Sequence, residues 1–253
     1  MPMKFSIVTP SYNSEKYISD TIESIKAQSG QDVEHIVVDG ASDDDTVNIV
    51  NKYDGITLIS EPDNGQSDAI NKGLMKASGD VVAWQNADDI YFPGCFDRVA
   101  EFLKSNNDVK MVYGYYQRID PQGKKLADVH PPSYKKWRFK YGRFYPVQPS
   151  VFFRKEVFEE LGYLDETLHY CMDIDLYCRI VLKYKIARIP HLLGAFRVHD
   201  ESKTQNKENY NEVKEELFNV LNRYFTYSSI GKILFEIFQA RARLGSYVKD
   251  EIL

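Results

Sequence analysis

Two adjacent carboxylates, Asp88 and Asp89, follow a short apolar run that ends in Gln85 and Asn86. Neighbouring carboxylates repel each other at neutral pH. Their presence side by side therefore suggests that a bound cation neutralises them. A hard divalent cation, Mg²⁺ or Mn²⁺, binds such carboxylate oxygens and keeps positions open for phosphate oxygens. The alternative is a turn in which an aspartate caps the backbone before the segment YFPG.

Polar residues also follow the three preceding apolar runs. These are residues 9–13 after the first run, 39–43 after the second, and 63–65 with Asp68 after the third. Ser42 and Asp43 suit a helix N-cap, but capping does not account for all four run ends. In open parallel sheets, ligands bind beyond the carboxyl ends of the strands. We therefore expect these groups to converge at one edge of a sheet.

The elements that position them are short apolar runs alternating with amphipathic stretches. The runs are residues 4–10, 33–40, 56–62 and 80–86, and each is followed by a helical pattern. Nearly continuous apolar runs are typical of strands that are buried on both faces. The alternation predicts βαβ units and a mostly parallel, Rossmann-like sheet flanked by helices.

The second half of the chain is less regular. Residues 110–119 favour a strand, 154–162 a short helix, 172–184 a longer helix, and 186–199 a final pair of strands. From about residue 207 the pattern is helical to the end, with a break near the segment YSSIG.

The composition argues against several classes of function. With 32 basic and 37 acidic residues, the net charge of −5 disfavours nucleic acid as a partner, because nucleic-acid binding needs a basic surface. Three cysteines form no CxxC pair and are expected to be reduced thiols. The first residues lack the apolar stretch of a signal peptide, and no run reaches the ~18 apolar residues of a membrane span. We predict a cytoplasmic protein.

A dehydrogenase lacks support. Asp39 lies where a nicotinamide-dependent enzyme places its ribose-binding acid, but the first turn, TPSYNSEKY, has no G-x-G-x-x-G motif. A P-loop motif is absent as well.

Five segments, in their order and spacing, resemble glycosyltransferase family 2. They are SIVTPSYNSEKYISDTIESI, VVDGASDDDT, EPDNGQSDAINKGLMKASGD, WQNADDIYFPG and MDIDLYCRI, and the resemblance covers residues 3 to about 200. It implies the GT-A fold and an inverting transfer of a sugar from a nucleoside diphosphate, with UDP as the most frequent carrier and Mn²⁺ or Mg²⁺ as cofactor.

The resemblance assigns the nucleotide site. Thr9 and Tyr12 would line the nucleotide pocket, and Asp39 would accept a hydrogen bond from the base. Asp68 and Lys72, on one predicted helix, would face the nucleotide, with Lys72 near the phosphates.

The acidic turn departs from the family pattern at one position. The family's metal motif is Asp-x-Asp-Asp, and its first position here is Asn86, which can bond a ribose hydroxyl but brings no charge. Asp88 matches the metal ligand. Asp89 is expected to cap or orient the turn.

The resemblance also implies a catalytic base in the segment CMDIDLYCRI. Asp173 matches the base, although Met172 stands where glutamate is common in the family. On a helix, Asp173 and Asp175 point about 200° apart, so both cannot face one substrate. Asp175 is expected to form a helix-surface ion pair with Arg179. A helix N-terminal carboxylate without catalytic function is the alternative for Asp173.

Four further residues receive roles from the resemblance. Gln148 is expected to contact the donor sugar or the acceptor. In the segment AFRVHDESKT, His199 is expected to approach the metal, and Arg197 or Lys203 a phosphate. A histidine that is merely polar and at the surface is the alternative for His199.

The segment YKKWRFKYGRFY (134–145) contains six aromatic residues, five cations and no acid. It is either a solvated loop over the core edge, a lid over an anionic lipid-linked acceptor, or a contact with anionic membrane. The C-terminal stretch IGKILFEIFQARARLGSYVK adds cations and large apolar residues. Core packing, a homodimer contact and peripheral attachment at the inner face of the membrane are the hypotheses for it.

These observations predict a GT-A domain over residues 1–206 and a C-terminal helical appendage over 207–253. The domain divides into a nucleotide-binding half at about 1–115 and an acceptor half at about 116–206. The function expected is transfer of a sugar to a hydroxyl of a glycan or lipid-linked acceptor. A non-catalytic nucleotide-sugar or carbohydrate binding protein is the alternative. A nucleotidyltransferase would need a glycine-rich basic first loop, which TPSYNSEKY does not provide.

Overall fold

The computed structural model describes residues 2–199, 210–237 and 239, and its strands form one mixed sheet. The strand order is β3-β2-β1-β4-β8-β6-β9-β5, with β7 paired to β6. The strands are β1 (Lys4–Ser11), β2 (Asp32–Asp39), β3 (Ile56–Ser60), β4 (Val81–Trp84), β5 (Ile90–Tyr91), β6 (Val109–Ile119), β7 (Lys125–Val129), β8 (Val151–Arg154) and β9 (Lys185–Arg197).

Helices cover both faces of this sheet. They are α1 (Ile18–Lys26), α2 (Thr46–Val50), α3 (Gln66–Lys76), α4 (Cys95–Ser105), α5 (Lys136–Lys140), α6 (Glu156–Leu161), α7 (Met172–Lys183) and α8 (Tyr210–Tyr224), with a 3₁₀ turn η1 (Gln148–Ser150). Residues 229–237 form a further helix. None of the helices in the described ranges combines the length and apolarity needed to span a membrane.

The parallel arrangement predicted for the first half is confirmed. β1 pairs in parallel with β2 on one side and β4 on the other, and β2 pairs in parallel with β3. β8 then enters antiparallel to both β4 and β6, which makes the sheet as a whole mixed. Four short apolar strands joined by helical crossovers explain the parallel part, because such connections return each strand in the same direction.

The expected final strand pair is wrong, because residues 185–197 form the single long strand β9. Pro190 and Gly194 suggest a turn from sequence alone. In the structure, β9 continues past Pro190 through register shifts against β6, and β-bulges of this kind accommodate a proline. Gly194 does not form a turn. It allows the backbone of Pro149 to approach β9 closely, since a Cβ at this position would lie 2.4 Å from the carbonyl oxygen of Pro149.

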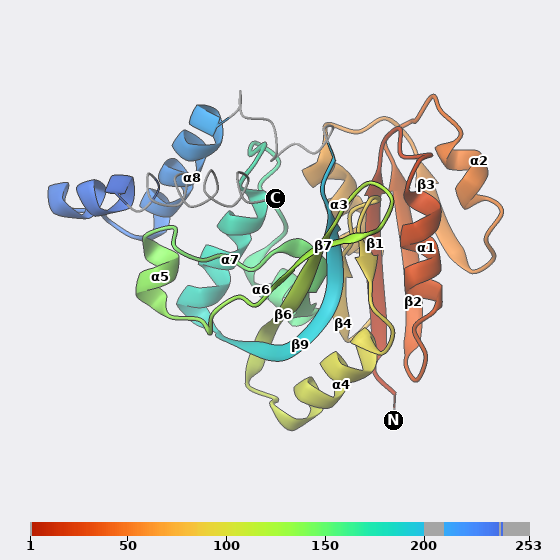
Figure 1. Cartoon of the computed structure of the whole chain (residues 1–253), viewed down its shortest axis with the longest axis horizontal. Coiled ribbons are helices and arrows are strands. Elements are labelled where there is room, and N and C mark those ends of the chain that lie inside the picture. Colours follow the sequence, from red (N-terminus) through yellow and green to blue (C-terminus); the bar gives the residue numbers. More distant parts are fainter. Residues whose placement is uncertain (1, 200–209, 238, 240–253) are drawn as a thin grey trace.

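Two main hydrophobic clusters lie on opposite faces of the sheet. One packs α3, α6, α7 and α8 against β4, β6 and β8, and the other packs α1 and α4 against β1, β6 and β9. Figure 1 shows β9 curving across the sheet, with α5, α7 and α8 on the side away from β1, β2 and β3. The three cysteines form no disulfide with one another, and all three are buried.

The predicted C-terminal helices are present, with the break at residues 225–228. Leu217, Val220 and Leu221 of α8, with Phe225 and Phe235 beyond it, belong to the same hydrophobic cluster as α7. Sequence periodicity identified these helices but did not show that they share the core of the main domain. The proposed boundary at 206/207 lies outside the described residues.

Candidate functional site

The carboxyl ends of β1, β2, β3 and β4 meet at one edge of the sheet, the upper edge in Figure 1. Ser11 pairs with Asp39 at the ends of β1 and β2, and Asp39 pairs with Ser60 at the end of β3. On the other side of β1, β4 leads directly into the acidic turn, residues 86–89. The polar residues that follow the four runs therefore share one edge, as a parallel topology requires.

Asp89 anchors the acidic turn from inside the protein. It is fully buried, and its carboxylate accepts the backbone N–H of Arg197 at 2.9 Å and the side-chain amide of Asn86 at 3.3 Å. The Thr21 hydroxyl donates to the Asp89 carbonyl at 2.8 Å. Burial, and then the adjacent Asp88 carboxylate, raise the pKa of Asp89 well above its ordinary value. The geometry agrees with an orienting function for Asp89.

Asp88 remains at the surface of the turn, beside His199. Its Oδ2 lies 2.9 Å from His199 Nε2, and 29% of the Asp88 side chain is exposed. The His199 ring packs against Tyr17, with ring centroids 5.1 Å apart. The structure thus brings together the two residues that the sequence proposed as metal ligands, although they are 111 positions apart.

A divalent metal fits this pair. One carboxylate oxygen and one imidazole nitrogen form a mixed donor set, which suits Mn²⁺ better than Mg²⁺, since Mg²⁺ prefers oxygen alone. Within the described residues, no group of three or more His, Cys, Asp or Glu side chains could hold a metal. A metal here would take its other ligands from water or a bound diphosphate.

Arg197 does not face the open edge, so the structure does not support its expected contact with donor or phosphate. Only 2% of it is exposed. Its Nε donates to the Asp88 carbonyl at 2.8 Å, one terminal nitrogen to the Pro121 carbonyl at 3.1 Å, and the other to the Asp20 carboxylate at 2.8 Å. The guanidinium also stacks on the Tyr17 ring at 4.6 Å. Arg197 therefore fixes the backbone of the acidic turn from behind.

We expect Arg197→Met to lower the free energy of unfolding by about 3 kcal/mol, because two buried carbonyls lose a charged donor. Denaturant unfolding measures this loss. Arg188→Met is the matched control, since Arg188 lies on the same strand and donates one hydrogen bond, to the Pro131 carbonyl. Unchanged stability with weaker nucleotide binding would instead support the phosphate contact. Lys203, the alternative phosphate ligand, lies outside the described residues.

The expected nucleotide residues divide into exposed and buried ones. Tyr12 is 64% exposed at the open edge, where a base could stack on it. Thr9 is fully buried, and its hydroxyl lies 2.9 Å from His35 Nε2, so its side chain does not line a pocket at this edge. Burial lowers the pKa of His35 to about 3, which keeps the ring neutral. The alternation of side chains along β1 turns Thr9 into the sheet–helix interface.

Asp39 organises three serines at the strand ends. Its carboxylate accepts hydrogen bonds from the hydroxyls of Ser11, Ser42 and Ser60, at 3.3, 2.5 and 2.9 Å, and from the Ser42 N–H at 3.0 Å. It is fully buried, so a base N–H would have to replace one of these donors. The sequence placed Ser11 and Ser42 among the polar residues at this edge, but it did not pair them with Asp39, and it did not single out Ser60.

Asp68 and Lys72 hold the loop between β3 and α3. Asp68 Oδ2 accepts the backbone N–H of Asn64 at 2.9 Å, and Lys72 Nζ lies 3.5 Å from the same oxygen. Lys72 also donates to the Pro62 carbonyl at 3.1 Å and pairs with Glu61 at 3.0 Å. These contacts shape the loop, and Lys72 would have to leave them to reach a phosphate. Asn86 is bonded as well, accepting from the Gln66 amide at 3.0 Å.

Asp173 lies in the first turn of α7 and remains partly accessible. Its carboxylate accepts the Ile174 N–H at 2.8 Å. Burial, and then the negative charge of Glu216, raise the pKa of Asp173 to about 6. A carboxylate with such a pKa is ionised at neutral pH yet is basic enough to take a proton.

Asp175 pairs with Arg179 at 2.9 Å, as predicted. The expected surface location is wrong, since only 3% of Asp175 is exposed. Arg179 also donates to the carbonyls of Leu161 and Tyr163, at 2.7 and 2.8 Å. The pair is buried because α8 covers this face of α7, which the helical pattern alone does not reveal.

Gln148 connects α7 to the end of β4. Its side-chain amide donates to the Trp84 carbonyl at 2.6 Å and accepts the Tyr177 hydroxyl at 3.2 Å. Trp84 lies two residues before Asn86, and Tyr177 lies one helical turn after Asp173. Gln148 is therefore mostly buried between the acidic turn and the helix that carries Asp173.

Sequence comparisons agree with this arrangement. Residues 6–162 match the profile of glycosyl transferase family 2. A glycosyltransferase of Rickettsia typhi is 30% identical over 226 residues, which cover 84% of this chain and 70% of the relative. A glycosyltransferase of Rickettsia felis is 29% identical over 217 residues, covering 82% of this chain but only 36% of the relative's length.

Two solved structures share the fold. TarS of S. aureus (residues 1–349), in complex with UDP-GlcNAc, superposes with a TM-score of 0.71 and 20% identity, over 94% of this chain and 72% of that one. The mannosyltransferase PcManGT of Pyrobaculum calidifontis, in complex with GDP-Man and Mn²⁺, gives 0.66 and 17%, over 92% and 68%. The GT-A expectation is thereby confirmed. The chain belongs to glycosyl transferase family 2.

Proposed function

We propose that this protein is an inverting glycosyltransferase that moves a sugar from a nucleoside diphosphate, with UDP the first carrier to test, to a hydroxyl of a glycan or lipid-linked acceptor. One observation carries the proposal. Gln148 ties the end of β4, which precedes Asp88, to α7, which carries Asp173. A leaving-group site and a base therefore lie on elements that are bonded to each other.

The residues divide the chemistry between them. Asp88 and His199 would hold Mn²⁺ or Mg²⁺, which supplies positive charge to the departing diphosphate. Asp89 and Arg197 keep the acidic turn in place. Asp173 accepts the proton of the acceptor hydroxyl as that oxygen attacks the anomeric carbon, from the face opposite the nucleotide. Tyr12 and Asp39 stand at the end of the edge where the base would bind.

An assay of nucleotide release tests the proposal against the non-catalytic alternative. The protein is incubated with Mn²⁺ and UDP-glucose, UDP-N-acetylglucosamine or GDP-mannose, and free nucleoside diphosphate is measured. A glycosyltransferase releases it slowly even with water as acceptor. A binding protein on the same fold would retain or exchange the intact nucleotide sugar without producing any.

We also propose that a basic and apolar surface near α5 contacts anionic membrane. Lys135 and Lys136 are exposed beside Trp137, which is 49% exposed. The helix over residues 229–237 lies next to this segment, because Lys140 Nζ donates to the Thr226 carbonyl at 3.4 Å and the Gln239 amide to the Gly142 carbonyl at 3.3 Å. Cations interleaved with apolar side chains suit anionic lipid headgroups.

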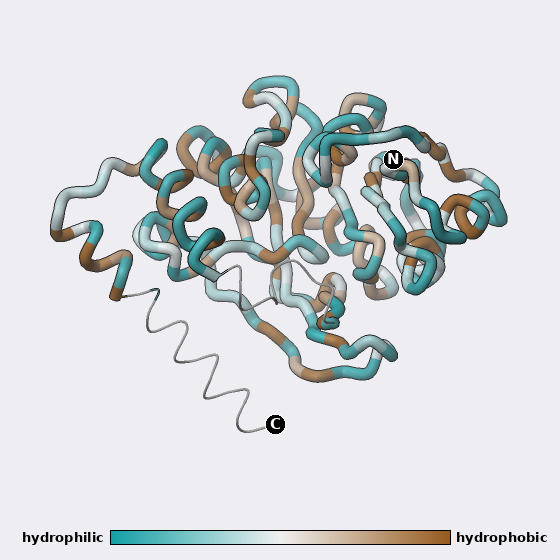
Figure 2. The backbone as a smooth tube through the Cα atoms, turned by 90° about the horizontal axis from the view of Figure 1, so that it is seen from above, coloured by the Kyte–Doolittle hydropathy of each residue, from teal (hydrophilic) through white to brown (hydrophobic). Residues whose placement is uncertain are grey.

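The same helix exposes an apolar face. Ile230, Ile233 and Ile237 are 71%, 58% and 42% exposed, at helical spacing. Figure 2 shows this stretch alternating between hydrophobic and hydrophilic colours at the outer edge of the molecule. Its opposite face packs inward through Phe235, which is fully buried.

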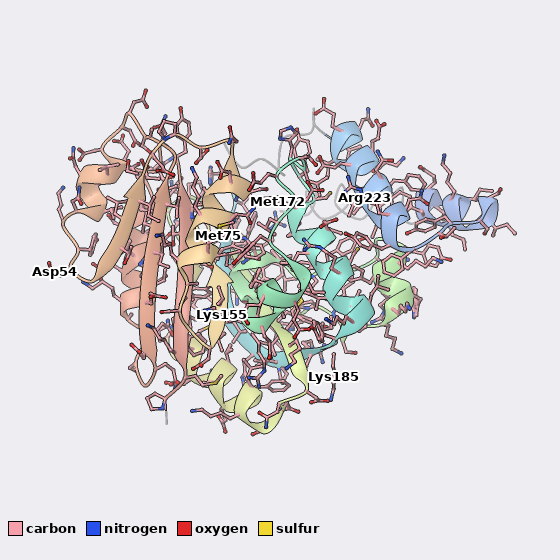
Figure 3. The ribbon with its side chains drawn as sticks, turned by 180° about the vertical axis from the view of Figure 1, so that it is seen from behind. Asp54, Met75, Lys155, Met172, Lys185 and Arg223 are labelled. Carbon is pink, nitrogen blue, oxygen red and sulfur yellow. The ribbon has the colours of Figure 1, made fainter. Side chains whose placement is uncertain are left out.

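We expect the protein to sediment with phosphatidylglycerol vesicles at low salt but not with phosphatidylcholine vesicles. The double variant Ile230→Ser, Ile233→Ser should lose most of this binding, because two apolar side chains no longer insert. Met75→Ser is the control, since Met75 is also an exposed apolar residue, 60% exposed, but lies on α3, away from the helix over residues 229–237 (Figure 3). The alternative is that a second copy of the chain covers this face. In that case wild type would not sediment with either vesicle, and it would be a dimer that the double substitution converts to a monomer.

A further inference from the structure

A carboxylate from α8 caps the start of α7. Glu216 Oε1 accepts the backbone N–H groups of Tyr170 and Cys171 at 2.8 and 2.7 Å, and Oε2 accepts that of His169 at 3.1 Å. Cys171 is the N-cap residue of α7, and its own side chain makes no capping hydrogen bond. The N–H groups at a helix start, that of Cys171 included, have no partner within the helix, so α8 supplies the acceptor here, as it does for the two residues just before the helix.

Other residues of α8 bond the chain on both sides of Asp173. Arg223 donates to the Asp165 carboxylate at 2.9 Å, ahead of it, and the Tyr224 hydroxyl donates to Asp175 at 2.7 Å, after it. In Figure 3, Met172, the first residue of α7, and Arg223 both lie in the upper half of the view. The segment that carries Asp173 therefore has its path set by α8 and not only by its own helix.

We infer that Glu216 is the positioning residue for Asp173: by capping residues 169–171 it fixes the direction in which the first turn of α7 presents the Asp173 carboxylate to the acceptor. This inference rests on the proposed function. Only one residue, Met172, separates the capped Cys171 from Asp173. A change in the cap therefore rotates or displaces the carboxylate directly, and a displacement of about 1 Å can cost 10²-fold in rate.

The charge of Glu216 acts on Asp173 as well. Burial, and then the Glu216 carboxylate, raise the pKa of Asp173 to about 6. Among the described residues, the other titratable groups that interact with Asp173 are thiols and phenols, namely Tyr145, Cys171, Tyr177 and Cys178. Burial raises the pKa values of all four, so they are neutral near pH 6. Because the base must be ionised, turnover should fall as the pH drops through about 6.

The test compares Glu216→Gln with wild type in nucleotide release from UDP-N-acetylglucosamine, or from whichever of the three donors above reacts fastest. We expect kcat to fall about tenfold while KM for the donor is unchanged, because the donor site is untouched. We also expect the acidic limb of the pH profile to move to lower pH, since one negative charge near Asp173 is gone. A purely structural cap would change stability but leave both kcat and the acidic limb where they are.

Two further variants separate position from charge. Glu216→Asp keeps the charge but is one methylene too short for all three N–H groups, so kcat should fall while the acidic limb stays near the wild-type pH. Glu212→Gln is the matched control one turn earlier on α8, where the carboxylate accepts the Tyr170 hydroxyl at 3.2 Å and, within the described part of the chain, no backbone N–H group. It should behave like wild type.

The outcomes are distinct. Wild-type kcat and acidic limb in Glu216→Gln would overturn the inference; if that variant does not fold, wild-type kcat in Glu216→Asp would do so. If nucleotide release survives in Asp173→Asn, Asp173 is not the base, and that part of the proposed function is wrong.

Discussion

Asp173→Asn is expected to reduce sugar transfer by about 10³-fold, because an amide cannot accept the proton of the attacking hydroxyl. Nucleotide binding should survive, since the one side-chain hydrogen bond described for Asp173 is to the neighbouring Ile174 N–H. Nucleotide release and calorimetric titration with UDP and Mn²⁺ measure the two properties separately. If binding is lost together with transfer, Asp173 is a structural residue.

The same substitution has a predicted effect on stability, with a definite sign. The pKa of Asp173 is about 6 in the folded protein, above the 3.8 of an unperturbed aspartate, so the folded state binds more protons between these pH values. Stability therefore falls as the pH rises from about 4 to about 6, and the ionised side chain is unfavourable above that range. Asp173→Asn should raise the melting temperature at pH 7.5, which is typical of a functional charge kept at a cost in stability.

Glu156→Gln is the matched control for this experiment. Glu156 is also a carboxylate in the first turn of a helix, α6, and it forms a surface pair with Lys110. If Asp173 merely interacts with the helix dipole, both substitutions should cost a few tenths of a kcal/mol and leave transfer intact. If Asp173 is the base, only Asp173→Asn should stop transfer.

Asp88→Ala is expected to abolish the metal dependence of nucleotide binding. A ligand that binds only the folded state at 100 times its Kd stabilises the protein by about 2.7 kcal/mol. In a thermal-shift panel of UDP, GDP and dTDP, each with and without Mn²⁺, one nucleotide should raise the wild-type melting temperature only when the metal is present. The variant should show no such difference, because His199 alone remains to hold the ion.

Asp128→Ala controls for the loss of a carboxylate elsewhere, since Asp128 lies on β7 and pairs with Lys125. His199→Ala should weaken the metal-dependent shift without removing it entirely, if both residues are ligands. If Asp88→Ala keeps the full metal-dependent shift in melting temperature, the ion binds elsewhere, and the acidic turn is not the metal site. No shift with any nucleotide in wild type would favour a glycan-binding protein instead.

The sequence determined the parallel half of the fold because its information is local. Short apolar runs separated by amphipathic stretches leave few alternatives to βαβ units, and these bring the ends of β1 to β4 to one edge. The positions of Asp88 and Asp39 at that edge follow from the runs themselves. The same local pattern located α7 and the helices after residue 210.

Only the tertiary structure decided which polar groups are available at that edge. Thr9 lies near the end of β1 and Arg197 ends β9, as ligand-binding residues would. Yet the Thr9 side chain is turned toward His35, and Arg197 is enclosed by Asp20 and Tyr17. Whether a polar group near a strand end is exposed depends on which elements pack over it. Sequence spacing does not contain that information.

The sequence by itself determined the family, the sheet edge and the acidic residues that could do chemistry, since each depends on neighbours along the chain. The tertiary structure decided that His199 stands 2.9 Å from Asp88, that Gln148 joins β4 to α7, and that Glu216 caps the helix of Asp173. These contacts join residues far apart in the chain. They arise because β9 pairs with β6 and β5 and ends beside the acidic turn, and because α8 packs onto α7. No local pattern specifies either arrangement.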